Sequence, residues 1–231
     1  MSIWTRISDA ALLVGGSLVS VLSRVSGGSP DTTAEPERSV AFTIGVIALG
    51  AKMAKVDGWV SGAEVTAFKE VFQVAPEELA NVARVFNLAK QDVAGFEAYA
   101  RQLARLFADR PEVLEDVVDS LFHIAKSDGA IDEAEVKFLS EVADIFGLTP
   151  RFRCIMARHV YAAENEPYAI LGIDPCVSDE EARRHYRRLV RENHPDRHIA
   201  AGMPAEMVAI ANERLAAITT AWSEIARERR L

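Results

Sequence analysis

Residues 186–198 read Tyr-Arg-Arg-Leu-Val-Arg-Glu-Asn-His-Pro-Asp-Arg-His, a helical pattern that is interrupted by a proline. An apolar stripe at helical spacing runs along this segment and its upstream flank, and it consists of Ala182, Tyr186, Leu189 and Val190. Five arginines fall on the other side: Arg183, Arg184, Arg187, Arg188 and Arg191. The pattern predicts an amphipathic helix whose outer face, called the basic face below, carries these arginines.

Pro195 predicts the end of that helix, because proline lacks an N–H and disfavours the helical conformation in the residue before it. We expect the helix to end near Asn193 and to leave His194, Pro195 and Asp196 at an exposed loop tip. A stiff, exposed tripeptide suits contact with a partner better than core packing. Alone, however, the tripeptide also fits a short polar turn, so its interpretation depends on its flanks.

The flanking segments predict a helical hairpin around this tripeptide. Before it, Ser178 and Glu181 form a capping-box pattern that would start the basic helix. After it, residues 204–229 form a second amphipathic pattern, whose apolar stripe contains Leu215, Ile218, Ala221, Trp222 and Ile225. We expect the two helices to lie antiparallel and to bury Tyr186 and Leu189 between them.

Residues 164–231 resemble the J domain of the DnaJ (heat-shock forty-type) co-chaperone family. The resemblance rests on the order Tyr-x-x-Leu-Gly-Ile, basic helix, His-Pro-Asp, and a helix ending in Ala-Ile-x-x-Ala-Trp. It implies that His194, Pro195, Asp196 and the basic face bind a DnaK-type ATPase, which performs the chemistry. Asn193 departs from the family, which usually has an aromatic residue there. The family's fourth short helix and its Gly/Phe-rich and zinc modules are not seen, so client binding stays open.

Residues 39–163 carry helical patterns throughout, and the fold class expected for the whole chain is all-α. Within this region the sequence repeats itself at an offset of 71 residues, residues 54–65 aligning with residues 125–136. Each copy is an apolar helix, an Asp-Gly turn and another helix. The repeat therefore predicts two related helix–turn–helix units in one bundle. Between the copies, residues 86–106 supply apolar positions that are better interpreted as core than as a cofactor site.

The chemistry of the turns explains why the same residue types recur at the same spacing in both copies of the repeat. Gly58 and Gly129 would supply the left-handed conformation that ends a helix. Ser61 with Glu64, and Asp132 with Glu135, form capping-box patterns just beyond those glycines. Structural roles are thus sufficient for these polar residues.

A functional alternative exists for the acidic residues of the repeat. Asp57, Glu64, Asp128 and Glu135 could converge across a pseudo-twofold axis and bind a hard cation or a basic partner, because calcium and magnesium prefer oxygen ligands. The spacing is not that of an EF-hand, whose loop alternates oxygen ligands and ends in glutamate.

The repeated pattern Lys-x-Asp-Gly-x-[Val/Ile]-x-x-x-Glu resembles the TerB-type domain, an all-helical module named from tellurite resistance. A short apolar amino-terminal segment, a TerB-like domain and a carboxy-terminal J domain occur in the same order in the DjlA group of bacterial membrane-associated DnaJ-like proteins. This resemblance implies that the TerB-like domain is a localisation or sensing module with its own protein partner.

The amino-terminal residues 1–25 are mainly apolar, but the uncharged run within them covers only residues 10–23. A membrane-spanning helix needs about 20 residues, so a full span is not expected, in contrast to DjlA proteins that have one. Without a basic start or a cleavage site, secretion is not expected either. Either a short helix that packs on protein or an interfacial anchor at the membrane fits residues 3–25. Residues 26–38, rich in Gly and Pro, are predicted to be a flexible linker.

The composition restricts the remaining functions. A net charge of -8 argues against nucleic-acid binding. Two cysteines without metal-ligand spacing, Cys154 and Cys176, favour a reducing compartment, hence the cytoplasm, with or without peripheral association with the inner face of the membrane. His194 and His198 have a metal-like spacing that Pro195 breaks, and His123 and His159 are expected in the core or at its edge.

Three functional hypotheses follow, and the first is a co-chaperone without enzymatic activity or cofactor. The second is a stress or envelope adaptor in which the TerB-like domain binds a partner or metal and the J domain is inactive. The third makes His194 and Asp196 part of a metal hydrolase. No nucleophile motif or phosphate-binding glycine loop supports the third.

Overall fold

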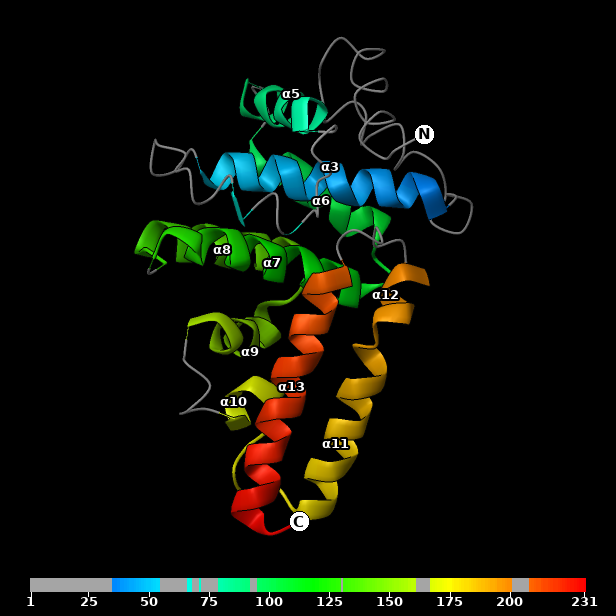
Figure 1. The fold of residues 1–231 in the computed structure, drawn as a ribbon, viewed down its shortest axis with the longest axis vertical. Coiled ribbons are helices and arrows are strands. Elements are labelled where there is room, and N and C mark those ends of the chain that lie inside the picture. Colours follow the sequence, from blue (N-terminus) through cyan, green and yellow to red (C-terminus); the bar gives the residue numbers. More distant parts are fainter. Residues whose placement is uncertain are drawn as a thin grey trace.

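The computed structural model describes residues 35–54, 66–67, 71, 79–91, 95–129, 131–160, 167–200 and 208–231. Within these ranges every regular element is a helix, so the all-α prediction is confirmed (Figure 1). The predictions made for residues 1–34 and for residues 55–65, the first copy of the repeat, lie outside the described residues. The two-fold relation between the copies therefore stays a prediction.

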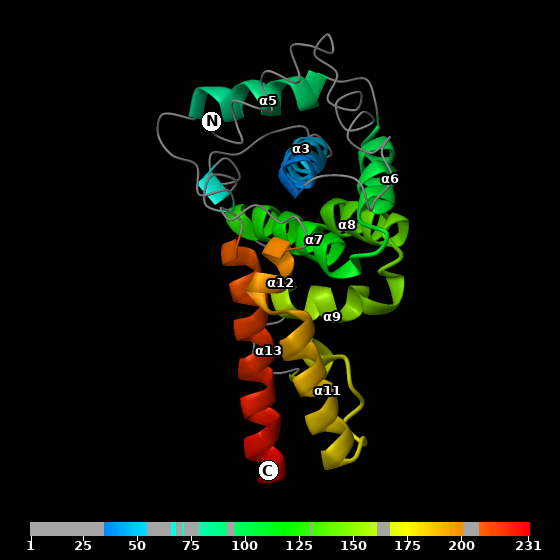
Figure 2. The ribbon, with the colours of Figure 1, turned by 90° about the vertical axis from the view of Figure 1, so that its right-hand side faces the viewer.

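The amino-terminal bundle is built around helices α3 and α7. Its elements are α3 (Glu35–Met53), α5 (Leu79–Gln91), α6 (Phe96–Leu106), α7 (Pro111–Ala125), the 3-10 turn η2 (Lys126–Asp128), α8 (Glu133–Ile145) and α9 (Thr149–Val160). Helix α3 packs against α5, α6 and α7, and α7 packs in turn against α8 and α9. Figure 2 shows α3 end-on, with these neighbours on three sides.

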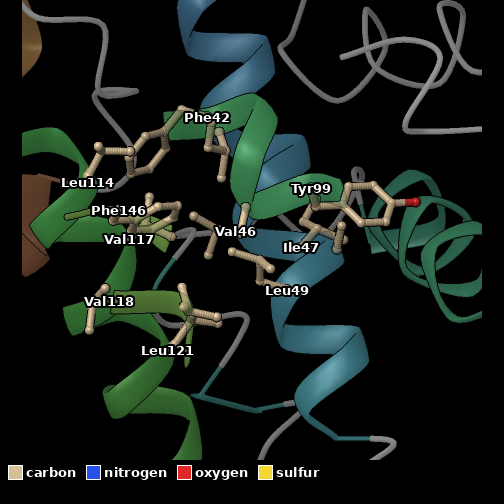
Figure 3. Packing of buried hydrophobic residues seen from close by; sticks show 14 of the residues in the cluster. Phe42, Val46, Ile47, Leu49, Tyr99, Leu114, Val117, Val118, Leu121 and Phe146 are labelled. Atoms are coloured by element: carbon tan, nitrogen blue, oxygen red, sulfur yellow. The ribbon is translucent and has the colours of Figure 1, made fainter. Parts of the chain in front are cut away.

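The core of this bundle is apolar and lies mainly between α3 and α7. Figure 3 shows Phe42, Val46 and Leu49 of α3 near Leu114 and Val117 of α7, and all five side chains are buried. Full burial of one such side chain stabilises the fold by about 1.5–3 kcal/mol. The residues predicted as core between the repeat copies behave accordingly: Tyr99, Leu103 and Leu106 are buried, and Leu88 and Phe96 are half-buried.

Helix α3 begins at Glu35, which places the last residues of the predicted linker 26–38 inside a helix. The linker interpretation counted Pro36 as a helix-breaking signal. Proline is tolerated in the first turn of a helix, however, because the N–H groups there have no intrahelical partner. Pro36 thus belongs to the start of α3.

The second copy of the repeat has the predicted capping box. Asp132 accepts a hydrogen bond from the Glu135 N–H at 2.8 Å, and Glu135 accepts one from the Asp132 N–H at 3.0 Å. Gly129 has a φ of 146° and a ψ of -134°, so its φ is positive but its conformation is not the left-handed helical one that we expected. A short 3-10 turn, η2, follows α7 and changes the geometry of the helix end.

The carboxy-terminal part is a helical hairpin preceded by a short helix. It consists of α10 (Pro167–Leu171), α11 (Asp179–Glu192), α12 (Pro195–Ala200) and α13 (Val208–Arg229). The predicted capping box between Ser178 and Glu181 is present. Tyr186 stacks on Trp222 with ring centroids 4.8 Å apart, as the antiparallel hairpin predicted. Gly172, with a φ of 68°, supplies the left-handed turn after α10.

Among the described residues, the hairpin joins the core of the bundle near the start of α13, and Ala157 of α9 also packs into the core of the hairpin. Ile210 and Ala211, in the first turn of α13, belong to the core of the bundle, whereas Ile225 belongs to a separate small core of the hairpin. Figures 1 and 2 show α12 at this junction and the carboxy terminus at the far end. Among the described helices, none has the length and apolar character needed to cross a bilayer.

Candidate partner-binding site

The tripeptide His194, Pro195 and Asp196, called the corner below, lies where α11 gives way to α12. Helix α11 ends at Glu192 with Asn193 as its C-cap, as predicted. The loop-tip prediction was wrong in one respect, since Pro195 and Asp196 form the first turn of α12 and only His194 lies in the connection. Proline is favoured at the first helical position, so one residue ends α11 and starts α12.

The corner is exposed and locally ordered by its own backbone. The side chains of His194 and Asp196 are 53% and 87% exposed. The Nδ1 atom of His194 lies 3.3 Å from the N–H of Asp196, which donates to it, and 3.6 Å from the carboxylate of Asp196. The imidazole and the carboxylate therefore face solvent side by side, available to another molecule.

The basic face is also exposed, and it leads directly into the corner. All five of its arginines are exposed: Arg183, Arg184, Arg187, Arg188 and Arg191. Arg184 lies 3.6 Å from Glu180, and Arg188 lies 3.9 Å from Glu192, as i,i+4 pairs. Such exposed pairs contribute little to stability. The charge of this face is thus available for binding.

His185 fixes the inner side of α11 to α10. Its Nε2 lies 2.8 Å from the carbonyl oxygen of Leu171, which accepts the hydrogen bond, while Arg188 donates to Nδ1 at 2.8 Å. Burial lowers the pKa of His185, although the carbonyl of Leu171 acts against this shift. The neutral ring with a proton on Nε2 fits both contacts.

Asn193, which departs from the resembled family, is buried rather than presented to solvent. Its side chain donates to the carbonyl oxygen of Leu189 at 2.8 Å and accepts a hydrogen bond from Arg214 at 2.9 Å. The asparagine thus connects the end of α11 with α13, directly behind the corner. An aromatic side chain could not make these two hydrogen bonds.

Arg214 and His198 carry this connection onward to two carboxylates of α7. Arg214 donates to Asp119 at 2.7 Å and also to Asp116. His198, in α12, contacts Asp116 through Nδ1. We call Asp116, Asp119, Asn193, His198 and Arg214 the junction network, and each of these residues is at most 3% exposed.

Helix α9 makes a second set of ion pairs with α7. Arg158 donates to Glu115 at 2.8 Å and to Asp119 at 3.0 Å, and His159 lies 2.7 Å from Asp119. Arg151 lies 3.0 Å from Glu115. The buried acids of α7 are therefore shared between α9 and the carboxy-terminal hairpin.

In these buried groups, burial disfavours the charged form, and neighbouring groups of opposite charge favour it. Burial raises the pKa of Asp119, but the guanidinium groups of Arg158 and Arg214 outweigh it and hold that pKa well below its usual range. For Asp116 burial prevails and the pKa is raised. Burial lowers the pKa of His159 despite its hydrogen bond with Asp119. In Arg214, by contrast, the facing carboxylates overcome burial and raise the pKa.

Sequence reasoning missed the junction network. A signal was present, because residues 111–125 form an apolar helix in which Glu115, Asp116 and Asp119 occupy positions that would be buried. Buried acids require partners, and those partners are far away in the sequence. His123 and His159 lie at the edge of the core, as expected, with side chains 25% and 13% exposed.

The acidic residues proposed as metal ligands are only partly covered by the structure. Asp57 and Glu64 lie outside the described residues, Asp128 lies in η2, and Glu135 caps α8. Within the described ranges, no group of three or more His, Cys, Asp or Glu residues is placed to hold a metal ion. Metal binding by these four residues stays a prediction.

Family models match both parts of the chain. The model of the DnaJ domain matches residues 166–229, and the model described as tellurite resistance protein TerB matches residues 43–158. With the helical hairpin and the exposed corner, these matches define a J-domain protein whose amino-terminal bundle is a TerB domain. The chain belongs to the DjlA-like group of bacterial DnaJ-family co-chaperones, in which a TerB domain precedes a carboxy-terminal J domain.

Three relatives illustrate this membership, and each is named co-chaperone protein DjlA. The protein of Shewanella oneidensis is 32% identical over 133 residues, which cover 52% of this chain and 51% of the relative. The protein of Legionella pneumophila is 26% identical, with 83% of this chain and 79% of the relative covered. For Coxiella burnetii the identity is 25%, with 77% and 73% covered. No solved structure matches the chain.

Proposed function

We propose that this co-chaperone binds a DnaK-type ATPase through its J domain and stimulates ATP hydrolysis by that partner. The observation that carries the proposal is the exposed corner at the end of an exposed basic helix. The imidazole of His194 and the carboxylate of Asp196 are accessible together, and Pro195 restricts the backbone between them. Such a rigid polar corner suits recognition of another protein.

The basic face and the corner have different parts in this function. The arginines steer an acidic surface of the partner towards α11, because charge complementarity mainly affects encounter rate and orientation. The corner then favours the hydrolysis-competent state of the partner by binding that state more tightly. The catalytic groups belong to the partner, and this chain acts without catalysis of its own.

For the TerB domain we propose a localisation or sensing role at the cytoplasmic face of the membrane. The support is the order of domains, which resembles that of the membrane-associated DjlA group, together with residues 3–25, which are apolar enough for an interfacial helix. Fractionation without detergent of the chain with and without residues 1–26 tests this role. A full-length chain that remains entirely in the soluble fraction would rule out the anchor.

ATP turnover by a DnaK-type partner tests the main proposal. Wild type should accelerate turnover, whereas His194→Gln and Asp196→Asn should leave it at the unstimulated rate while circular dichroism shows an intact fold. Glu133→Gln is the matched control, because it removes an exposed carboxylate of the TerB domain. It should stimulate like wild type.

The other hypotheses correspond to different outcomes of the same assay. Absence of stimulation by wild type contradicts the proposal and favours the adaptor. Full stimulation by Asp196→Asn would contradict the role of the corner. ATP or phosphoester hydrolysis that requires a metal but no partner would support the hydrolase.

A further inference from the structure

Both ends of the corner are connected to one carboxylate of the TerB domain. His198 lies two residues after Asp196 and contacts Asp116 directly. Asn193 lies immediately before His194 and reaches Asp116 through Arg214. The structure thus places a residue of α7, about eighty positions earlier in the chain, behind the partner-binding tripeptide.

The burial of this connection excludes direct contact with the partner. Asp116 and His198 are fully buried, and Asn193 and Arg214 are each 3% exposed. A partner bound to the corner therefore cannot touch these side chains without unfolding the junction. Any influence that they have on the partner must act through the position of the corner.

Helix α12 depends on the junction network for its orientation. It has six residues, all of them described, and His198 is the one buried side chain among them. A helix of this length is not stable by itself in water. The apolar core of the hairpin, which includes Leu189, Ile218 and Ile225, contains no residue of α12. The contact between His198 and Asp116 is therefore the buried attachment of α12 to α7, beside packing on α13 and an exposed pair in which Arg197 lies 3.9 Å from Glu112.

Buried ion pairs of this kind select one arrangement. Taking charges out of water costs free energy that the pairing only partly returns, so their net contribution to stability is small. Rearrangement is nevertheless unfavourable, since it would break contacts of Asp116 with His198 or Arg214 while the carboxylate stays buried. The network consequently favours a single direction for the corner relative to α7.

We propose that Asp116 of the TerB domain is a positioning residue for the corner, acting through His198 on one side and through Arg214 and Asn193 on the other. The inference rests on the proposed function and deepens it, because it makes the TerB domain a determinant of how strongly the J domain stimulates its partner. Since α7 also lies at the centre of the TerB core, a ligand that displaces α7 changes the presentation of the corner.

The test compares two neighbouring buried residues of α7 in the full-length chain. Asp116→Ala removes the contacts with His198 and Arg214, whereas Val117→Ala removes apolar contact with the core that Figure 3 shows around Val117. Both variants should lose stability in urea unfolding. ATP turnover by the DnaK-type partner is then measured over a range of variant concentrations, giving a maximal stimulation and a half-maximal concentration.

We expect Asp116→Ala to lower the maximal stimulation about ten-fold, because small misplacements of a recognition group have large effects on rate. Its half-maximal concentration should stay near that of wild type, since the basic face is intact. Val117→Ala should keep the wild-type maximum. Asp116→Asn, which retains an oxygen acceptor for Arg214, should recover part of the loss.

Two other results overturn the inference. Wild-type stimulation by folded Asp116→Ala would show that the corner is positioned without α7, and equal losses in both alanine variants would assign the effect to stability. If Asp116→Ala does not fold, Asp116→Asn and Asn193→Leu decide, because both should lower the maximum and the double variant should be no worse than the poorer single one. Failure of wild type to stimulate would instead contradict the proposed function.

Discussion

Arginines occur in two contrasting environments in this chain. On α11, Arg183, Arg187 and Arg191 are exposed, and within the described residues none of them is paired with a carboxylate. At the junction, the side chains of Arg158 and Arg214 are 5% and 1% exposed, and each contacts two carboxylates of α7. The same residue type thus serves two different purposes in this chain.

The exposed arginines are suited to recognition of a partner, whereas the buried arginines hold the helices together. An exposed guanidinium keeps its hydration until a partner arrives, so it costs the fold nothing and remains available. A buried guanidinium is committed to its carboxylates, because removal of either partner leaves a desolvated charge. Substitution of a buried arginine should therefore lower stability, whereas substitution of an exposed arginine should mainly slow association.

Arg214→Met should have the largest effect on folding. It leaves Asp116 and Asp119 without the charge that joins them to α13, and loss of one partner of a buried ion pair costs about 3–5 kcal/mol. Urea unfolding of the full-length variant measures this loss. Arg187→Met is the matched control on the exposed face and should change the free energy of unfolding by less than about 0.5 kcal/mol. Equal losses would contradict the contrast between the two groups.

Acidification should lower the stability of the fold through His159 of α9 and His185 of α11. Burial lowers the pKa of His159 and of His185 below the usual value of 6.5, so below that pH the unfolded chain binds more protons than the folded one. Stability must then fall as the pH decreases from about 6.5. At more acidic pH, protonation of Asp119, whose pKa is lowered in the folded state, removes a further contribution, whereas protonation of Asp116, whose pKa is raised by burial, acts in the opposite direction.

Urea unfolding between pH 7.5 and pH 5 is the measurement, at about half-unit intervals. His159→Phe keeps an aromatic ring against Phe122, on which His159 stacks with centroids 5.0 Å apart, but it cannot be protonated. Its stability should decline less steeply than that of wild type. An identical slope for wild type and variant would show that His159 does not contribute to the acid sensitivity.

Patterns that are local in the sequence predicted the structure well. Ser178 with Glu181 and Asp132 with Glu135 form capping boxes because each pair needs only residues three positions apart. The stripe containing Tyr186 and Leu189 packs on α13 because helical periodicity fixes which face is apolar. The exposed corner and basic face follow from the same local reasoning.

Predictions failed where one residue fitted two local structures or where the partner was distant. Pro36 and Pro195 were interpreted only as breaks, although proline also suits the first turn of α3 and of α12. Asn193 was noted as a departure without an explanation, because Arg214, its partner, is set by the packing of α13 on α7. No spacing within a single helix encodes that contact.

Arg187→Ala should have the smallest effect, and only on association. The exposed guanidinium contributes to the field of the basic face, so its removal should slow binding to the DnaK-type partner about three-fold at low salt. At about 1 M salt the difference should vanish, because the screening length falls to about 3 Å. Stopped-flow association rates at several salt concentrations give this dependence. Arg84→Ala, an exposed position on α5 of the TerB domain, is the control and should leave the salt dependence unchanged. If both variants reduced it equally, steering would depend on the net charge of the whole chain, and the distinct role of the exposed arginines of α11 would be lost.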